Sequence, residues 1–354
     1  MAVQTPAARK PVLAALPRLS KQLNLIGTVI LLGLLAAILL INIKEDWQLV
    51  VSATLLGITY GAVYALVALG YTLVYGIIEL INFAHGDVFM WGTMIAITFG
   101  VDWLGLNGSQ SGIVTTLGVA ATMIFCALFC LTLNVTIERF AYRPLRNAPK
   151  LAPLITAIGM SFVLQGLALW RFGPGSRTAD NVFPDNNLFS IGIYGYPAKN
   201  LIVVAATIPL LIALVYLVQY TRQGKAMRAT AQDTDAARMM GINIDRTIAF
   251  TFLLGGALAG AGGTLFVFWY TSTKFDLGFT LGLYAFTAAV LGGIGNLKGA
   301  ALGSVCLGLI QAYNDSLNHM PGTNWTQSVI FTVLILVLVF RPQGLLGEEV
   351  PDRA

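Results

Sequence analysis

The residue types most able to do chemistry in this chain lie in a short polar stretch between two apolar runs. Asn82, His85 and Asp87 stand close together, after Glu79 and before the apolar sequence that resumes at Val88. Amide, imidazole and carboxylate groups in apolar surroundings need hydrogen-bonding partners, because lipid supplies none. Such a break is therefore either a turn at a membrane surface or a non-helical segment that lines a cavity.

Other reactive side chains are scattered. The second histidine, His319, is far from His85 in the sequence, and no second ligand stands near either. The three cysteines, Cys126, Cys130 and Cys306, all lie in apolar runs, which is typical of small buried packing residues. The sequence therefore predicts no metal site, no catalytic site and no cofactor.

A phosphate-binding loop is also absent. The nearest candidate is Gly224-Lys225, but Ala226 follows where Ser or Thr is required, and Gln219 stands where the first glycine belongs. We therefore expect that the chain itself neither binds nor hydrolyses ATP.

The composition determines the class of protein. Hydrophobic residues make up 56% of the 354 residues and charged residues only 10%, against roughly 25% charged in a soluble domain. So few charges cannot cover the surface of a soluble fold. The sequence predicts an all-α, polytopic membrane helix bundle with about 8–10 transmembrane segments.

Ten apolar runs follow one another along the chain. They are 23–43, 49–78, 88–104, 113–137, 151–170, 201–220, 247–270, 281–294, 299–313 and 327–340. The first is too long for the core of a cleaved signal peptide. We predict an extension at residues 1–22, a transmembrane domain at 23–340 and a tail at 341–354. The short runs 281–294 and 299–313 meet at a glycine-rich junction, which indicates broken or half-buried helices.

The basic residues predict the orientation. If all ten runs cross, five of the 21 lysines and arginines lie on one side, namely Lys44, Arg171, Arg177, Lys199 and Lys274, and the other 16 share a side with the N-terminus. Lys and Arg concentrate in cytoplasmic loops. Both termini are therefore predicted to be cytoplasmic.

The cytoplasmic loop 221–246 predicts a short surface helix. Asp233 or Thr234 is a suitable N-cap, and Asp235 then stands where the helix dipole favours a carboxylate. Gly241 suits the left-handed position that ends a helix. This helix, of about two turns, is either a docking element that offers Met239 and Met240 for contact or a simple connector.

Motifs in the loop and elsewhere carry a resemblance. Asp235-Ala236-Ala237-x-x-x-Gly241 is similar to the Glu-Ala-Ala-x-x-x-Gly loop by which permeases of ABC importers dock onto their ATPases, although Asp replaces Glu. The resemblance implies ATPase coupling by Asp235, Ala236, Ala237, Met239, Met240 and Gly241.

Further motifs resemble the permease family of branched-chain amino-acid ABC importers, in the shorter of its two permease types. They are Gly70-Tyr-Thr-Leu-Val-Tyr-Gly76, Ile81-Asn-Phe-Ala-His-Gly-Asp87, Arg143-Pro-Leu-Arg146, Gly224-Lys-Ala-Met-Arg-Ala229, Leu291-Gly-Gly-Ile-Gly-Asn-Leu-Lys-Gly299 and Phe340-Arg-Pro-Gln-Gly-Leu345. The resemblance covers roughly residues 48–347. It implies a bacterial inner-membrane protein with a second permease, two cytoplasmic ATPases that hydrolyse the ATP, an external substrate-binding protein and no nucleic acid.

A transported amino acid would need polar groups along its path and an apolar wall for an apolar side chain. Asn82, His85 and Asn296 are the polar candidates near the two breaks. The alternative is that both breaks are interfacial turns on the cytoplasmic side.

The function expected from the resemblance is import of branched-chain or other neutral amino acids. One alternative is the same importer type for urea or short amides. Another is an ion-coupled secondary transporter, which usually carries ionisable groups inside its spans. The acidic residues expected near loops or span ends, which argue against that class, are Glu79, Asp87, Asp102, Glu138 and Asp276. Nothing supports a membrane enzyme.

Overall fold

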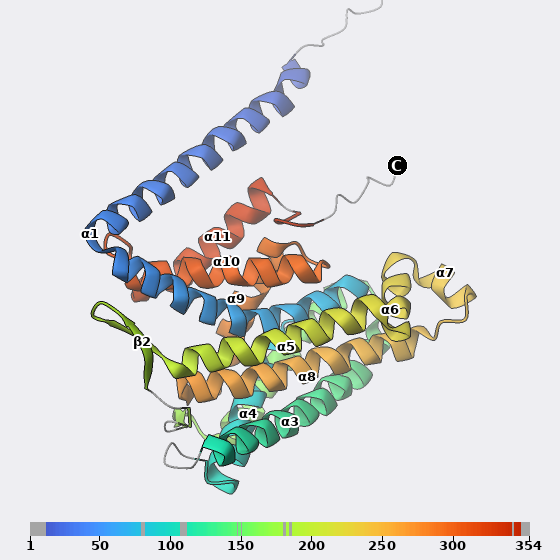
Figure 1. Ribbon diagram of the computed structural model, residues 1–354. Helices are drawn as coiled ribbons and strands as arrows, with labels where there is room; N and C mark the ends of the chain where they lie inside the picture. Colours follow the sequence, from blue (N-terminus) through green and yellow to red (C-terminus); the bar gives the residue numbers. More distant parts are fainter. Residues whose placement is uncertain are drawn as a thin grey trace, which may run out of the picture.

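The computed structural model describes residues 12–78, 82–106, 112–146, 148–149, 151–179, 182–183, 186–341 and 343–347, with side chains at residue 37 and from residue 39 onward. Figure 1 shows a bundle of helices with one small hairpin, which contains β2, at one end. In chain order the elements are α1 (Val12–Ile78), α2 (Ala84–Ala96), the π-helix η1 (Ile97–Trp103), α3 (Gly112–Ile137), the π-helix η2 (Glu138–Tyr142), the 3-10 helix η3 (Arg143–Leu145), α4 (Leu151–Phe172), β1 (Arg177–Thr178), β2 (Asn187–Ile191), β3 (Tyr194–Pro197), α5 (Ala198–Tyr220), α6 (Arg222–Gln232), α7 (Thr234–Met239), α8 (Ile244–Tyr270), β4 (Ser272–Thr273), α9 (Leu277–Gly292), α10 (Leu297–Ser316), the 3-10 helix η4 (Thr323–Trp325) and α11 (Thr326–Phe340).

The predicted all-α, polytopic class is confirmed, and each apolar run lies on helical residues, with no more than two of its residues beyond a helix end. Within the described residues, six helices are long and apolar enough to cross a membrane alone, and α9 with α10 would add a seventh, bent span. The ten apolar runs also include residues 23–43 in the first part of α1, α2 with η1, and α9 and α10 separately. Residues 1–11 and 348–354 lie outside the described residues. The division into an extension, a transmembrane domain and a tail stays a prediction.

The long helix α1 consists of two limbs that meet at Asp46. This residue has non-helical backbone angles (φ −152°, ψ 88°), and its Oδ1 accepts hydrogen bonds from the N–H groups of Gln48 and Leu49, both at 3.0 Å. Asp46 is thus the N-cap of the second limb, which follows the first limb without a loop between them. The first run was predicted to end at residue 43, and the chain bends three residues later (Figure 1).

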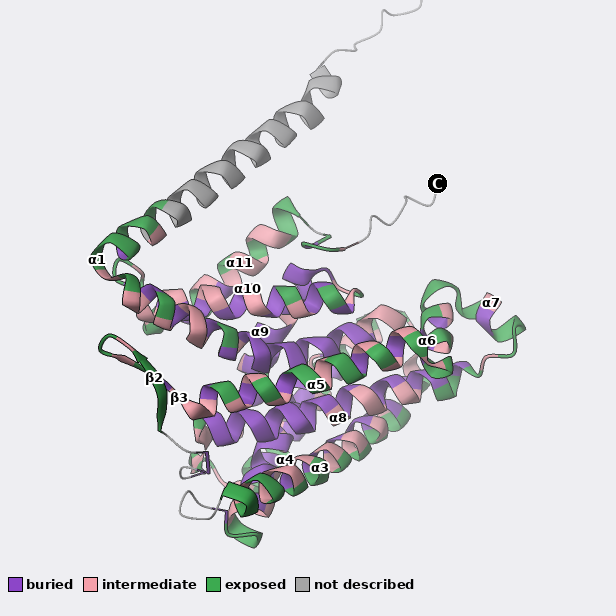
Figure 2. Ribbon diagram, viewed as in Figure 1, coloured by how far each residue is buried: buried purple, intermediate pink, exposed green. Residues whose placement is uncertain are grey.

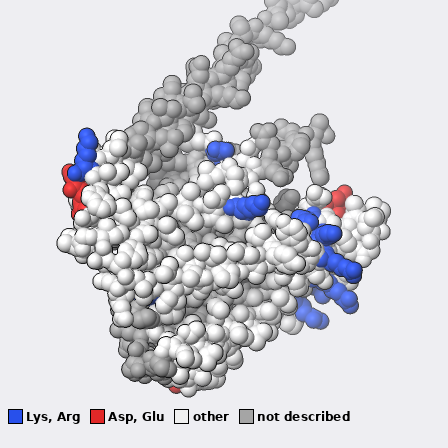
Figure 3. All heavy atoms as spheres, in the orientation of Figure 1, with Lys and Arg blue, Asp and Glu red and all other residues white. Residues whose placement is uncertain are grey.

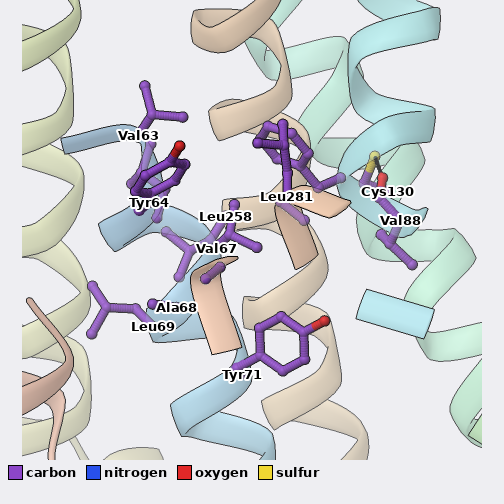
Figure 4. Packing of buried hydrophobic residues seen from close by; sticks show 14 of the residues in the cluster. Val63, Tyr64, Val67, Ala68, Leu69, Tyr71, Val88, Cys130, Leu258 and Leu281 are labelled. Atoms are coloured by element: carbon purple, nitrogen blue, oxygen red, sulfur yellow. Dashed lines mark hydrogen bonds between the residues drawn. The ribbon is translucent and has the colours of Figure 1, made fainter. Parts of the chain in front are cut away.

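The second limb of α1 and the helix α8 form the centre of the bundle. In each of them 78% of the most apolar window is buried, against 11–22% in α3, α4, α5 and α11. Figure 2 shows this contrast, with buried residues concentrated on the inner helices. Side chains from α1, α2, α3, α8 and α9 meet in the core seen in Figure 4, where Tyr64, Val88, Cys130, Leu258 and Leu281 all lie.

The bundle has two ends, which we call the hairpin end, marked by β2 and β3, and the α7 end. Polar contacts join loops that the alternating count of runs places on one side. They are Tyr194 with Asp46, Arg177 with Asp102 and Asn42 with Asn318 at the hairpin end, and Arg143 and Arg146 with Asp245 at the α7 end. Lys and Arg side chains gather at the α7 end, while the middle of the visible face carries almost no charge (Figure 3). The structure therefore supports the alternation of the runs.

Close backbone contact holds α8 against α3. A β-carbon at Gly256 or Gly260 would overlap the backbone of Cys130 or Cys126 on α3. Both cysteines are fully buried, which agrees with the expected packing role. Small residues of this kind let membrane helices approach one another closely.

The helices α9 and α10 form a bent pair with an angle of 119° between them. At the bend, Gly292 and Gly299 lie so close that a β-carbon on either would collide with the backbone of the other. Gly293 and Gly295 have φ angles of +107° and +95°, which favour glycine. The broken helix expected from the glycine-rich junction is confirmed.

We predict that Gly260→Leu lowers the thermal stability of the detergent-solubilised protein. The new side chain would drive α8 away from Cys126, and overpacking of this kind costs about 1–3 kcal/mol or more. The fraction of protein that stays monodisperse after heating measures the effect. The matched control is Gly166→Leu on α4, where nothing lies within 4 Å of the added β-carbon. Equal midpoints for the two variants would contradict the prediction.

Candidate functional site

The short helix α7 is capped at both ends. The side chain of Asp233 accepts hydrogen bonds from the N–H groups of Asp235 and Ala236, both at 2.9 Å, so Asp233 and not Thr234 is the N-cap. Gly241 has a φ of +82°. Its N–H donates to Arg238 O at 3.0 Å, and the N–H of Ile242 donates to Ala237 O at 3.1 Å. This pattern is a Schellman C-cap. The predicted helix is present, with six residues.

The exposure of α7 is uneven. Ala237 is buried at 4% exposure, whereas Met239 and Met240 are 83% and 84% exposed. Asp235 is also exposed and pairs with Arg238 at 3.3 Å. The helix thus rests on the bundle through its alanine and points two flexible, polarisable thioethers outward, a combination suited to contact with another protein.

The surroundings of α7 are basic and firmly attached to the bundle. Arg228 on α6 donates to the carbonyls of Val218 and Gln219 at the end of α5. Near the start of α8, Asp245 accepts from Arg143 and Arg146. The exposed basic residues of α6, α7 and the start of α8 are Arg222, Lys225, Arg228, Arg238 and Arg246. Figure 3 shows blue atoms gathered over this end.

The first polar break is buried inside the bundle as far as it is described. Asn82 and His85 are 1% and 0% exposed. Tyr142 donates its hydroxyl to Asn82 Oδ1 at 2.7 Å, and the ring of His85 stands edge-on to Tyr71, with centroids 5.0 Å apart. Glu79, Leu80 and Ile81 lie outside the described residues. Protein thus surrounds Asn82 and His85, and both interpretations of this break stay open.

Several buried polar atoms in this region have no hydrogen-bond partner among the described residues. They include Asn82 Nδ2, both ring nitrogens of His85, Thr72 Oγ1 and Asn134 Oδ1. His85 sits against the backbone of Gly70, where any β-carbon would strike its ring. Since buried polar atoms are nearly always paired, these atoms are candidates for contact with a polar solute or water.

Asp87, one helical turn into α2, is fully buried as well. Its carboxylate accepts hydrogen bonds from Ser161 Oγ and, at 3.1 Å, from Gln165 Nε2, both on α4. The expectation that this acidic group lies near a helix end is correct, but its burial was not predicted. Ser161 and Gln165 are one turn apart on an apolar helix, and that spacing was the available signal for a buried polar contact.

The second polar break lies at the bend between α9 and α10. Asn296 caps α10, because its Oδ1 accepts from the N–H groups of Lys298 and Gly299 at 3.0 and 3.2 Å, and its Nδ2 donates to Leu346 O at 2.8 Å. The hydrogen bonds of Asn296 thus go to nearby backbone and do not reach Asn82 or His85.

Residues 343–347, which we call the strap, complete this bend. The N–H groups of Leu345 and Leu346 donate to Leu291 O and Gly292 O at 2.8 and 3.0 Å. These carbonyls belong to the last turn of α9, where a helix leaves acceptors unpaired. Sequence reasoning missed the strap, whose signal was a second glycine-containing motif after α11.

Metal binding has no support in the described part of the chain. No group of three or more His, Cys, Asp or Glu side chains there could hold an ion. The site residues therefore form two separate regions, an exposed helix at the α7 end and a buried polar cluster between α1, α2 and α4.

The sequence of this chain matches a known protein family and several of its members. The sequence pattern of a family described as "Branched-chain amino acid transport system / permease component" matches residues 53–339. The chain is 39% identical over 301 residues to the high-affinity branched-chain amino acid transport system permease protein BraD of Pseudomonas aeruginosa, covering 82% of this chain and 94% of BraD. It is 40% identical over 298 residues to the corresponding protein LivH of Escherichia coli (strain K12), with the same coverage.

A more distant relative is named for the import of a different compound. The autoinducer 2 import system permease protein LsrD of Escherichia coli O157:H7 is 26% identical over 258 residues, which cover 69% of this chain and 72% of LsrD. The family match spans most of the chain, and the two stronger relatives agree with it along nearly their whole length. The chain therefore belongs to the permease-component family of branched-chain amino acid transport systems.

Proposed function

We propose that this chain is the membrane-spanning permease subunit of an ATP-binding-cassette importer for branched-chain or other neutral amino acids. The observation that carries the proposal is the 39–40% identity to BraD and LivH over 82% of the chain. The two-ended bundle of apolar helices supports a role as a conduit rather than an enzyme. ATP hydrolysis is assigned to two partner subunits, and substrate delivery to an external binding protein.

The α7 end is the cytoplasmic face in this proposal, because the basic residues gather there. The helix α7 is the coupling element that the ATPases grip. Its support is structural: Ala237 anchors it, both ends are capped, and Met239 and Met240 project outward. A rigid, capped helix transmits movement of a partner better than a loose loop does. Both chain termini then lie in the cytoplasm of a bacterial inner-membrane protein.

A second permease subunit is expected against the outer helices. The helices α3, α4, α5 and α11 expose most of their apolar surface, which either lipid or a companion subunit can cover. The hairpin end faces outward and is the side that an external binding protein would approach. There the turn between β2 and β3 carries Ile193, which is 86% exposed.

Asn82 and His85 are proposed to contact substrate only when helices around them separate. Both side chains are buried in this structure. Their atoms without a partner among the described residues could bind substrate when the surrounding helices move apart. The placement of Asn296 on the path stays a prediction. Its capping contacts give it a second, structural role, and the two roles can be separated by experiment.

One observation favours the alternative of an ion-coupled transporter. Asp87 is a buried carboxylate within the bundle, the kind of group that such proteins use. Its described partners, Ser161 and Gln165, are neutral, and no observation shows an ion pathway. An ion-coupled transporter is driven by an ion gradient, whereas an importer of this family's type is driven by ATP. The energy source of uptake therefore distinguishes the two, whether the substrate is an amino acid, urea or a short amide.

We predict that liposomes with this chain alone take up no L-leucine. Adding the companion permease, the two ATPases and the binding protein is expected to give uptake that requires ATP, because the ATPases are proposed to supply the nucleotide sites. Radiolabelled leucine retained on filters measures the uptake. Accumulation by the isolated chain under a proton or sodium gradient would instead favour the ion-coupled alternative.

We predict that Met239→Glu with Met240→Glu weakens retention of the ATPases during co-purification by about tenfold, or ~1.4 kcal/mol. Both side chains are more than four-fifths exposed, so the change acts on the contact and not on the fold. Ile193→Glu is the matched control, with equal exposure at the opposite end. Gly241→Val is expected to act likewise through strain at φ +82°. Normal retention in both the double methionine variant and Gly241→Val would exclude the docking role.

We predict that Asn296→Ala lowers thermal stability by about 1 kcal/mol through loss of the cap of α10. Asn296→Asp keeps the capping oxygen and loses only the bond to Leu346 O, so it is expected to be closer to wild type in stability. If Asn296 also contacts substrate, both variants reduce leucine uptake in the assembled importer. If the residue acts only as a cap, uptake follows stability, and Asn296→Asp transports nearly normally.

A further inference from the structure

A cavity of about 390 Å³ lies between α2 with η1, α3 and α4, toward the hairpin end of the bundle. This volume falls within the range of small-molecule sites, ~300–1,000 Å³. Aromatic side chains make up most of its lining, and we call it the aromatic groove. The helices α3 and α4 are outer helices, with 17% and 22% of their most apolar windows buried. The aromatic groove therefore opens toward the membrane.

Contacts between the rings fix the walls of the groove. Phe99 on η1 stacks on Phe125 on α3, with ring centroids 4.2 Å apart. Trp91 on α2 meets Phe172 on α4 edge-to-face at 5.8 Å, and its indole N–H donates to Leu164 O at 3.1 Å. The groove is thus formed before anything binds. Because water avoids apolar cavities, an apolar chain suits this lining.

A positive charge stands at the rim of the groove. Arg171, in the last turn of α4, is exposed and contributes to the lining. Its Cζ atom lies 5.3 Å from the centre of the Phe172 ring, and Cζ of Arg177 lies 5.1 Å from the same ring. Arg177 is neutralised by Asp102, at 2.5 Å. Among the described residues no carboxylate pairs with Arg171, so its charge is available to an anion.

The position of Arg171 along α4 places it at the depth of lipid headgroups. The helix α4 is long and apolar enough to span a membrane, and Arg171 is its second-last residue. Trp103 and Trp170 stand beside the groove and are 70% and 83% exposed. Tryptophan is enriched at the boundary between hydrocarbon and headgroups. The rim of the groove thus faces phosphate groups, and its rings face acyl chains.

We propose that the aromatic groove is a binding site for a phospholipid with a net negative charge. The phosphate pairs with the guanidinium group of Arg171, whose planar fork suits phosphate oxygens, and one acyl chain lies along the rings. A protein partner that covered Arg171 would have to bring a carboxylate to it, because an unpaired buried charge is costly. A lipid brings its phosphate to this depth in any case. The site requires neither the proposed transport activity nor a particular orientation in the membrane.

The experiment is native mass spectrometry of the full-length protein with dioleoyl-phosphatidylglycerol and dioleoyl-phosphatidylcholine. The two lipids have the same acyl chains, but the choline cation of the second cancels its phosphate charge. We expect one phosphatidylglycerol to be retained at about tenfold lower concentration than phosphatidylcholine, and Arg171→Gln to abolish this preference of ~1.4 kcal/mol. Lys44→Gln is the matched control, because Lys44 is exposed near the same end and does not line the groove. Leu167→Trp, which fills the groove, is expected to lower retention of both lipids.

Equal retention of the two lipids by the wild-type protein would reject the site, whatever the variants do. A preference that persists in Arg171→Gln would reject it as well. The same measurement on the chain purified with its companion permease tests the other occupant. Phosphatidylglycerol that is still retained there supports the lipid, whereas its complete loss on assembly would show that protein covers the groove. A failure of leucine uptake would reject the proposed function and leave these lipid measurements unchanged.

Discussion

Backbone-to-backbone contact along α8 is the constraint on which the rest of this bundle depends. Gly256 and Gly260 admit α3, and Gly263 admits α2, each at a distance where a β-carbon would collide. Lipid gives apolar helices no reason to prefer one another, so shape and dispersion must supply the attraction. With α8 held this closely, the polar groups of α1, α2 and α4 are enclosed rather than turned toward lipid. The buried cluster exists because the glycines of α8 leave no room for anything between the helices.

The two polar breaks answer the same physical demand in different ways. Asn82, His85 and Asp87 are placed inside the bundle, where hydroxyl and amide groups of other helices satisfy part of their hydrogen bonding. The α9–α10 bend instead receives backbone partners from the strap and a cap from Asn296. The first arrangement leaves unpartnered atoms within the described residues and suits a region that changes during transport. The second satisfies its helix ends and suits a fixed corner.

Local patterns in the sequence predicted the apolar helices and the short helix α7, but not the helix α6 that precedes it. Apolar runs located the bundle, and the chemistry of Asp233 and Gly241 predicted the bounds of α7. The burial of individual polar side chains was not predictable, because it depends on which helices pack together. Nothing adjacent to Asp87 in the chain indicates that Ser161 and Gln165, more than 70 residues away, lie against its carboxylate. The strap was missed for the same reason, since its partners come from a different helix.

The order in which the chain is synthesised has a consequence for the α9–α10 corner. Asn296 and its strap partner Leu346 are separated by 50 residues, so the corner enters the membrane well before the segment that completes it leaves the ribosome. During that interval the carbonyls of Leu291 and Gly292 lack their native donors. The corner is therefore a late step in biogenesis, and a nascent permease halted before residue 343 would present an unfinished helix end to the cell's quality-control proteases.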